Sequence, residues 1–368
     1  MSLELAEIMQ AIEEVAPISL QENYDNSGLI VGNSKMQISS ALLSLDCTPE
    51  VVLEAIDKGC NLVISHHPIV FSGLKRFNGN TYVDRAIQLA IKHDVALYAC
   101  HTNLDSVLHQ GVNHKIASRL ALIPQRVLSP QKNTLLKLSV TVPTEYKMAV
   151  ENAIFKAGAG QIGNYKDCGF SWSGVGSYTP QTGANPFEGS VDEPSRVEEQ
   201  KFEVVFPFYL KRQVLDAMFY AHPYEEVAYE LVALENEVLS VGSGLICQFR
   251  EPMSQPEFLA HLKKSMDLET FKYTRSDKIT IHRVAICGGS GAFLISKAKQ
   301  EKCDAYITSD VKYHEYFDAE NDMLLCDIGH FESEKYTVSI FAEILSKKFP
   351  NFATIFAHTN TNPVQYYK

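Results

Sequence analysis

The sequence predicts an α/β fold, in which a parallel-rich sheet is formed by both ends of the chain and interrupted by a ferredoxin-like α+β insert. Three observations predict it. Strand and helix patterns alternate over residues 41–100, the same alternation returns over 284–348, and the stretch between follows a different order. Alternating strands and helices are typical of parallel sheets, because a helix carries the chain back before each new strand.

The first part of the chain is expected to begin with a helix, since Leu5, Ile8, Met9 and Ile12 recur at helical spacing. Pro49 stands where a second helix would begin. The expected order after the first helix is a strand at 41–46, a helix at 49–57, a strand at 61–65, a helix at 82–93 and a strand at 95–100.

The last part repeats this style. We expect strands at 284–287, 305–308 and 323–328, and a final helix at about 333–348. The middle is predicted to run strand 136–142, helix 145–157, extended segments at 163–179, a loop at 180–200, strand 202–208, helix 210–222 and strand 227–234. This order is the split βαβ, ferredoxin-like pattern. It predicts an outer domain built from 1–129 and 238–368, with an insert at 130–237.

The amino-acid composition limits the class of protein to which the chain can belong. The chain has 368 residues, 45% of them hydrophobic and 21% charged, which suits a globular protein of two or three domains. The formal net charge of −11 disfavours nucleic-acid binding, which depends on neutralising phosphates. A small anionic ligand is still compatible, because a bound metal ion reverses the local field.

The sequence also predicts a cytoplasmic protein. The first residues carry acids where a signal peptide carries bases, and no apolar run reaches the ~18 residues of a membrane span. None of the eight cysteines forms a CxxC pair, and several lie within apolar runs. We therefore expect buried free thiols in a reducing compartment.

Candidate metal ligands follow three of the predicted strands. His66 and His67 end one strand, Asp105 follows a second, and His330 follows a third with Glu334 four residues later. Because functional groups gather at the carboxyl ends of parallel strands, these five side chains are expected at one sheet edge. Neighbouring residues on a strand point in opposite directions, so His66 and His67 would each serve a different ion of a pair. The alternative is that each residue is structural, with Asp105 capping a helix.

Other motifs are less specific. The GGSG sequence at 288–291 lies between a strand and a predicted helix, which suits either a phosphate-binding loop or a tight turn. Lys75, Arg76 and Lys312 lie near the candidate ligands in sequence and would suit an anion or simply solvated surface positions. GAGQIG at 158–163 matches a dinucleotide motif but follows a helix instead of a strand, which argues against that role.

At these residues the chain resembles the Nif-three-like, dinuclear-metal-centre proteins, often labelled GTP cyclohydrolase type 2 homologues. The matching segments are YDNSGLIVG (24–32), SHHP (65–68), HTNLD (101–105), TSDVKYH (308–314) and DIGHFESE (327–334). In the middle, GAGQIGNY (158–165) and HPYEE (222–226) look like the insert of the long family members, which is similar to the PII and CutA proteins.

The resemblance implies the metal ligands His66, His67, Asp105, His330 and Glu334, holding two divalent ions per chain. It also implies a ring-like homohexamer. Mixed imidazole and carboxylate ligands suit Zn, Fe, Mn or Ni. His101, four residues before Asp105, is a candidate residue close to the ligands for proton transfer.

Two functions follow from this pattern. The first is a metal-dependent hydrolase of a nucleotide or related phosphorylated small molecule, as the GTP cyclohydrolase label suggests. The second is a non-catalytic, metal-binding regulatory or scaffold oligomer whose insert binds a small effector or partner. Nucleic-acid binding through a ring-shaped assembly is the weakest alternative, because of the net charge.

Overall fold

The computed structural model describes residues 2–132 and 134–367. The chain divides into two compact units, one formed by 1–130 with 239–368 and the other by 131–238. Each is described by itself. In the described part of the chain, no helix has the length and apolar character needed to cross a membrane. All eight cysteines are free, and every one except the half-buried Cys168 is buried.

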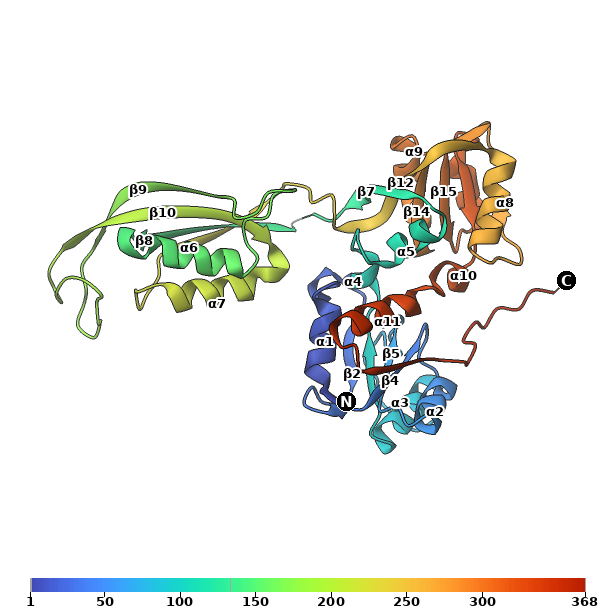
Figure 1. The fold of residues 1–368 in the computed structure, drawn as a ribbon, viewed down its shortest axis with the longest axis horizontal. Coiled ribbons are helices and arrows are strands. Elements are labelled where there is room, and N and C mark those ends of the chain that lie inside the picture. The colour runs from blue at the N-terminus through green and yellow to red at the C-terminus, as the bar shows by residue number, and fades with distance from the viewer. Residues whose placement is uncertain (1, 133, 368) are drawn as a thin grey trace. The chain divides into compact units, whose positions relative to one another are not determined.

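The first unit contains a five-stranded sheet in the order β17-β4-β5-β6-β2 (Figure 1). Its parallel strands are β17 (Ala353–Phe356), β4 (Ser40–Ser44), β5 (Leu62–Ser65) and β6 (Ala96–Ala99), and β2 (Gly28–Val31) runs antiparallel to β6. The connecting helices are α2 (Pro49–Asp57), with Pro49 in its first turn, and α3 (Tyr82–Lys92). Their apolar faces pack on Leu42, Val63 and Leu97 of the sheet.

A six-stranded sheet in the same unit has the order β13-β16-β15-β14-β12-β7. Its central strands β14 (Thr280–Ser290), β15 (Ala305–Ser309) and β16 (Leu324–Asp327) are parallel. The remaining strands, β12 (Gly242–Ser254), β7 (Ile123–Pro130) and β13 (Lys272–Tyr273), are antiparallel to their neighbours.

The expectation of one sheet is therefore wrong, because the expected strands divide between two separate sheets. Both sheets mix parallel and antiparallel pairs, and three of the four pairs in the first sheet are parallel. The physical reason for the division is that each end of the chain forms the central strands of one sheet. Each end also contributes one edge strand to the other sheet. The C-terminal part supplies β17 to the first sheet, and the N-terminal part supplies β7 to the second. A further two-stranded sheet pairs β1 (Leu3–Glu4) with β3 (Gln37–Ile38).

Further helices accompany the two sheets. They include α1 (Leu5–Glu13), α4 (Thr102–Asp105), α5 (Val112–Arg119), α8 (Gln255–Ser265), α9 (Ile295–Gln300), α10 (His330–Glu334) and α11 (Thr337–Lys348). Of these, α4 with α5 and α10 with α11 connect a strand of one sheet to a strand of the other. The single helix expected at 333–348 is two helices, and the first begins at His330. Gly329 permits this early start because its φ of +90° turns the chain sharply after β16.

The second unit is an antiparallel sheet of order β11-β8-β10-β9 with two helices on one face (Figure 1). Its elements are β8 (Leu135–Pro143), α6 (Lys147–Lys156), β9 (Gly169–Tyr178), β10 (Ser195–Pro207), α7 (Lys211–Ala221) and β11 (Tyr229–Leu234). Phe202 and Phe206 pack with Val150 and Met218 of the helices. The loop expected at 180–200 is shorter, because β10 already begins at Ser195 and pairs with β9 from there.

Candidate metal centre

The predicted ligands come together where residues that follow strands of the two sheets of the first unit meet. His66 and His67 directly follow β5, and the neighbouring β6 leads into α4, which ends at Asp105. His330 and Glu334 are the first and last residues of α10, which lies against β14 and β15. The site therefore lies between two sheets and not at the edge of one, contrary to the expectation from the sequence.

One group of ligand atoms is buried. Nε2 of His66 lies 3.7 Å from Oδ1 of Asp105 and 3.9 Å from Oε1 of Glu334. The ligand atoms of these three residues all lie within 4.8 Å of one another. This spacing leaves room for a cation between them without any direct hydrogen bond.

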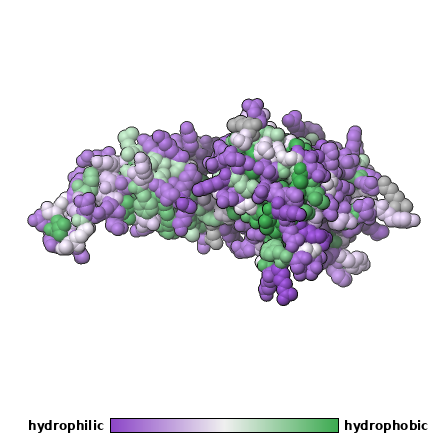
Figure 2. Space-filling view, turned by 90° about the horizontal axis from the view of Figure 1, so that it is seen from below, coloured by the Kyte–Doolittle hydropathy of each residue, from purple (hydrophilic) through white to green (hydrophobic). Residues whose placement is uncertain are grey.

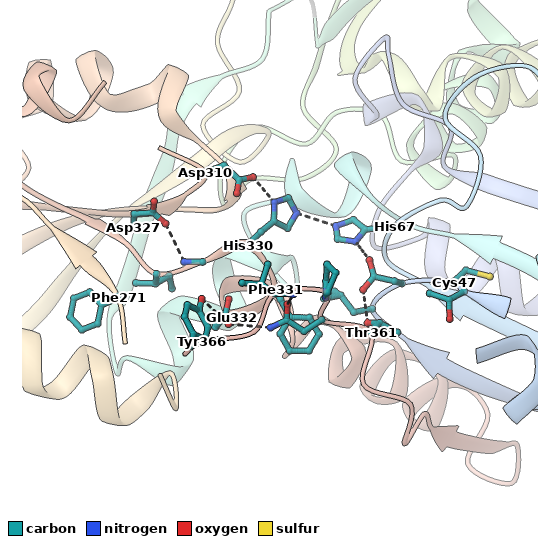
Figure 3. Close-up of a pocket in the computed structure, with 18 of the residues that line it drawn as sticks. Cys47, His67, Phe271, Asp310, Asp327, His330, Phe331, Glu332, Thr361 and Tyr366 are labelled. Atoms are coloured by element: carbon teal, nitrogen blue, oxygen red, sulfur yellow. Dashed lines mark hydrogen bonds and ion pairs between the residues drawn. The ribbon is translucent and has the colours of Figure 1, made fainter. Parts of the chain in front are cut away.

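A second group faces the opposite oxygen of the same glutamate. Nε2 of His67 lies 3.0 Å and Nε2 of His330 lies 3.1 Å from Oε2 of Glu334. The two imidazole Nε2 atoms are 3.4 Å apart (Figure 3). Glu334 thus presents one carboxylate oxygen to each group, which is the arrangement of a carboxylate shared by two candidate ion sites.

Each histidine of the site is oriented by a hydrogen bond at Nδ1, the ring nitrogen that faces away from the candidate ions. The partners are the carbonyl oxygen of Cys100 for His66 (2.8 Å), Asp46 for His67 (2.7 Å), Asp310 for His330 (2.6 Å) and Asp25 for His101 (2.8 Å). A hydrogen bond of this kind holds the proton on Nδ1 and leaves the lone pair of Nε2 for a metal. All four rings therefore have the direction that metal ligands need, and each neutral ring would present Nε2 to the metal.

Two buried atoms of the site lack a hydrogen bond. They are Nε2 of His66 and Oδ1 of Asp105. Burial lowers the pKa of His66 to about 4, so this imidazole is neutral at neutral pH. Burial, reinforced by the charge of Glu334, raises the pKa of Asp105 well above its usual range. An unpaired imidazole beside an unpaired carboxyl group is costly, and a bound cation would satisfy both atoms. The donor set therefore fits a divalent metal.

His67 and His330 hold protons when no metal competes. Burial alone would lower the pKa of His67, but hydrogen bonds to Asp46 and Glu334 raise it to about 10. Burial likewise opposes protonation of His330, yet contacts with Glu334 and Asp310 raise its pKa to about 9. Because a metal binds the deprotonated imidazole, these protons would be released when an ion binds.

The glycines at the end of β14 make room for Glu334. A Cβ at Gly289, whose φ is +62°, would lie 2.3 Å from Oε1 of Glu334. Two of the amide groups proposed for phosphate binding are already used, because Gly288 donates to Asn113 and Gly289 donates to the hydroxyl of Ser333. The α9 helix that follows has six residues. The phosphate hypothesis is therefore not supported, and the close packing of the segment explains its glycines.

Sequence reasoning missed part of the site. The ligand-type nitrogens of His66, His67 and His101 also lie within 4.8 Å of one another, so His101 is a further candidate ligand. The sequence pattern predicted His101 only as a proton-transfer candidate, and it did not predict a role for Asp46 or Asp310. Asp46 follows β4 and Asp310 follows β15, so the rule that located the histidines at strand ends would also have found them.

Lys75 and Lys312 lie outside this constellation. Both side chains are exposed, and neither residue lines the cavity beside the candidate ligands. Lys312 stands at the beginning of a 3₁₀ helix, where its amide group donates to Glu315. The structure therefore does not bring them together with the histidines.

A cavity of about 860 Å³ opens beside His67 and His330 (Figure 3). Its walls are rich in aromatic side chains, namely Phe71, Tyr82, Phe271, Phe331 and Tyr366. The basic residue in its lining is Lys272, which pairs with Asp327 at 3.2 Å. A ligand of the size of a nucleotide would find aromatic surface here, while anionic groups would find the candidate metal sites.

Fold and site together define an α/β protein with a candidate metal centre built by both ends of its chain. The chain belongs to the DUF34/NIF3 (NGG1p interacting factor 3) family, whose model matches residues 3–363. This confirms the resemblance that the sequence motifs indicated.

Relatives match over nearly the whole length. The chain is 36% identical to the GTP cyclohydrolase 1 type 2 homolog of Bacillus subtilis (strain 168), over 97% of both chains. It is 39% identical to the protein of the same name from Halalkalibacterium halodurans, over 88% of this chain and 87% of the relative. Among solved structures, the Bacillus cereus protein related to NIF3 matches with a TM-score of 0.84 and 35% identity, over 99% of both chains.

Proposed function

We propose that this protein binds two divalent metal ions per chain. His66, Asp105 and Oε1 of Glu334 would hold one ion, and His67, His330 and Oε2 of Glu334 the other. The observation that carries the proposal is the position of Glu334, whose two oxygens face two separate groups of ligands. Mixed nitrogen and oxygen donors suit Zn, Fe, Mn or Ni, and do not choose among them.

With its ions bound, the protein is proposed to be a hydrolase of a nucleotide or a related phosphorylated small molecule. Bound divalent ions would polarise the scissile group and lower the pKa of water toward ~7. The cavity beside His67 and His330 supports this substrate class, because its aromatic walls suit a planar base. The names of the relatives, GTP cyclohydrolase 1 type 2 homolog, point to the same class.

His101 is proposed to move a proton in this reaction. Its Nδ1 is held by Asp25, so Nε2 keeps a lone pair that can accept a proton from water. Burial opposes ionisation of Asp25, but hydrogen bonds with His101 and Thr102 lower its pKa below the usual range. Asp25 therefore remains a carboxylate that fixes the ring and stabilises a proton taken up by it.

The test of the hydrolase is a product screen on metal-loaded protein. GTP, ATP, nucleoside monophosphates and sugar phosphates are incubated with the wild type, with chelator-treated wild type and with His67→Ala. We expect product from the loaded wild type alone. His93→Ala, an exposed histidine at the end of α3, serves as the matched control and should keep full activity. Product formation that is unchanged by chelation would contradict the proposal.

A second candidate function is supported by the unit formed by 131–238. In it the metals are structural and the unit binds a small effector or partner. The strand order β11-β8-β10-β9 with two helices supports a ferredoxin-like, PII/CutA-like interpretation. A cavity of about 560 Å³ within this unit supports the binding of a small molecule. No turnover by fully loaded protein across the screen would favour this second function.

Self-association as a homohexamer is also proposed. Phe170 and Trp172 are exposed on the sheet face of the second unit that α6 and α7 do not cover. Apolar side chains on an uncovered sheet face favour contact with another chain. Light scattering should give about six times the chain mass of 41.1 kDa, and the mass of a monomer would contradict this proposal.

A further inference from the structure

A second cavity lies wholly within the unit formed by 131–238. It has a volume of about 560 Å³ and is bounded by the end of β9, the connection that follows it and the segment around 224–228. Figure 2 shows hydrophobic side chains at the tip of this unit, where that connection lies, and Phe187 and Val191 of the connection are exposed. The volume is sufficient for a small organic ligand.

Three aromatic rings form its walls. The ring of Tyr224 lies 6.3 Å from that of Tyr178 and 6.1 Å from that of Phe187, measured between centroids. All three residues line the cavity. Their π faces carry partial negative charge, which attracts a cation that comes within about 6 Å.

A buried carboxylate completes the cavity. Glu199 of β10 is 8% exposed, and its Oε1 accepts a hydrogen bond of 2.9 Å from the hydroxyl group of Tyr224. Among residues 2–132 and 134–367, no hydrogen bond or ion pair reaches Oε2. A Cβ at Gly176 would lie 2.2 Å from Oε2, so this glycine leaves the room that the carboxylate occupies.

The charged residues that line the cavity are all acidic. Glu225 and Glu226 line it together with Glu199, and its lining contains no lysine, arginine or histidine. Glu225 accepts a hydrogen bond from the amide group of Asn185, which fixes this carboxylate at the rim. Carboxylates between apolar walls focus a negative potential, which repels anions and concentrates cations.

We propose that this cavity binds a small organic ammonium ion, with the cation between the aromatic rings and against Oε2 of Glu199. The inference rests on the second candidate function, in which this unit binds an effector, and it names the chemical class of that effector. It does not depend on the metal centre, because every residue that it uses lies within 131–238.

The experiment is calorimetric titration of the full-length, metal-loaded protein with choline. The control ligand is 3,3-dimethylbutan-1-ol, which has nearly the same shape and no charge. We expect choline to bind at least 10-fold more tightly than the neutral compound, and its affinity to fall as salt is raised. Equal affinity for the two compounds, or no binding of choline, would overturn the inference.

Two matched pairs of variants locate the binding site. Glu199→Gln should weaken choline binding at least 10-fold, whereas Glu198→Gln, one residue away and exposed, should change it less than 2-fold. Gly176→Ala should also weaken binding, because its methyl group displaces Oε2 of Glu199. Gly174→Ala on the same strand meets nothing within 4 Å and should bind as the wild type does. The Gly176 pair keeps the test decisive if Glu199→Gln does not fold.

A parallel titration with ATP separates this inference from the function on which it rests. Binding of ATP that is weakened by Gly176→Ala but not by His67→Ala, without binding of choline, would overturn the cation inference and leave the effector function standing. Binding of neither would count against both. Choline binding that is unchanged in Glu199→Gln and Gly176→Ala would contradict the assigned site.

Discussion

Glu334 is the residue on which the candidate centre depends. Its side chain is 3% exposed and faces three histidines and Asp105. Burial opposes its ionisation, but hydrogen bonds with His330 and His67 lower its pKa, so it remains a carboxylate. A buried carboxylate of this kind is stable only beside cationic partners. In the metal-free protein these partners are protonated histidines, and in the loaded protein they are metal ions.

The position of Glu334 predicts a specific effect of Gly289→Ala. The new methyl group would collide with Oε1 of Glu334, so the variant should lose metal as well as stability. Gly59→Ala is the matched control, because Gly59 has a similar φ of +69° and nothing within 4 Å of the added Cβ. It should lose only the ~1–2 kcal/mol that a left-handed residue costs. Equal metal content in the two variants, measured by elemental analysis, would refute this effect.

His101 allows a second prediction at this scale. His101→Ala should keep both ions and lose turnover about 100-fold or more, because it removes a proton acceptor and not a ligand. Metal content and turnover are measured on the same sample, with His93→Ala as control. Loss of an ion would instead make His101 a ligand, which its distance to His66 and His67 also permits.

At the scale of elements, the last residues of the described chain join several parts of the first unit. Glu54 of α2 accepts hydrogen bonds from the amide groups of His358 and Thr359. Thr361 donates to Asp46, which in turn holds His67 (Figure 3). The segment therefore connects α2 with the wall of the cavity beside the candidate centre.

The anchor at Glu54 has a predictable pH dependence. Burial opposes its ionisation, but hydrogen bonds from His358, Lys58 and Thr359 lower its pKa to about 2 from 4.5. A lowered carboxyl pKa stabilises the fold above about pH 4.5, and this stabilisation is lost as the pH falls toward 2. Glu54→Gln should therefore cost about 1–3 kcal/mol of unfolding free energy at pH 7.

Urea unfolding of the wild type and the variant at several pH values measures this effect. The difference between them should shrink as the pH falls below 4.5. Asp57→Asn, an exposed position in the same helix, should show no such trend. A difference that stays constant down to pH 3 would contradict the assignment.

Individual elements show what the sequence could and could not predict. The periodic helix α2 and the apolar strands β5 and β6 were predicted within one or two residues, because their patterns are local. The alternation rule for His66 and His67 does not apply, since β5 ends at Ser65 and both residues follow it. The sequence patterns did not predict the break between α10 and α11 or the strand β12, because both depend on contacts with distant segments.

At the scale of the whole molecule, every candidate ligand belongs to the unit formed by 1–130 and 239–368. The rule that functional groups follow parallel strands predicted these residues. It could not predict that two sheets, one from each end of the chain, supply them, because sequence patterns do not determine which strands share a sheet.

This division predicts the result of removing the second unit. Pro130 pairs with Gly242 at the ends of β7 and β12, so a short Gly/Ser linker can replace 131–238. The shortened chain should bind as many ions as the full chain, as measured by elemental analysis, and should no longer bind choline. Loss of metal from a shortened chain that keeps its circular dichroism spectrum would contradict the assignment of the centre to one unit.

The most direct test of the account is the number of ions per chain in four proteins loaded with the same metal. Glu334 is shared by both proposed sites, whereas Asp105 belongs to one site and His330 to the other. We therefore expect two ions in the wild type, one in Asp105→Ala, one in His330→Ala and none in Glu334→Ala. A single ion in the wild type, or equal losses in Asp105→Ala and Glu334→Ala, would contradict a centre that is shared through one carboxylate.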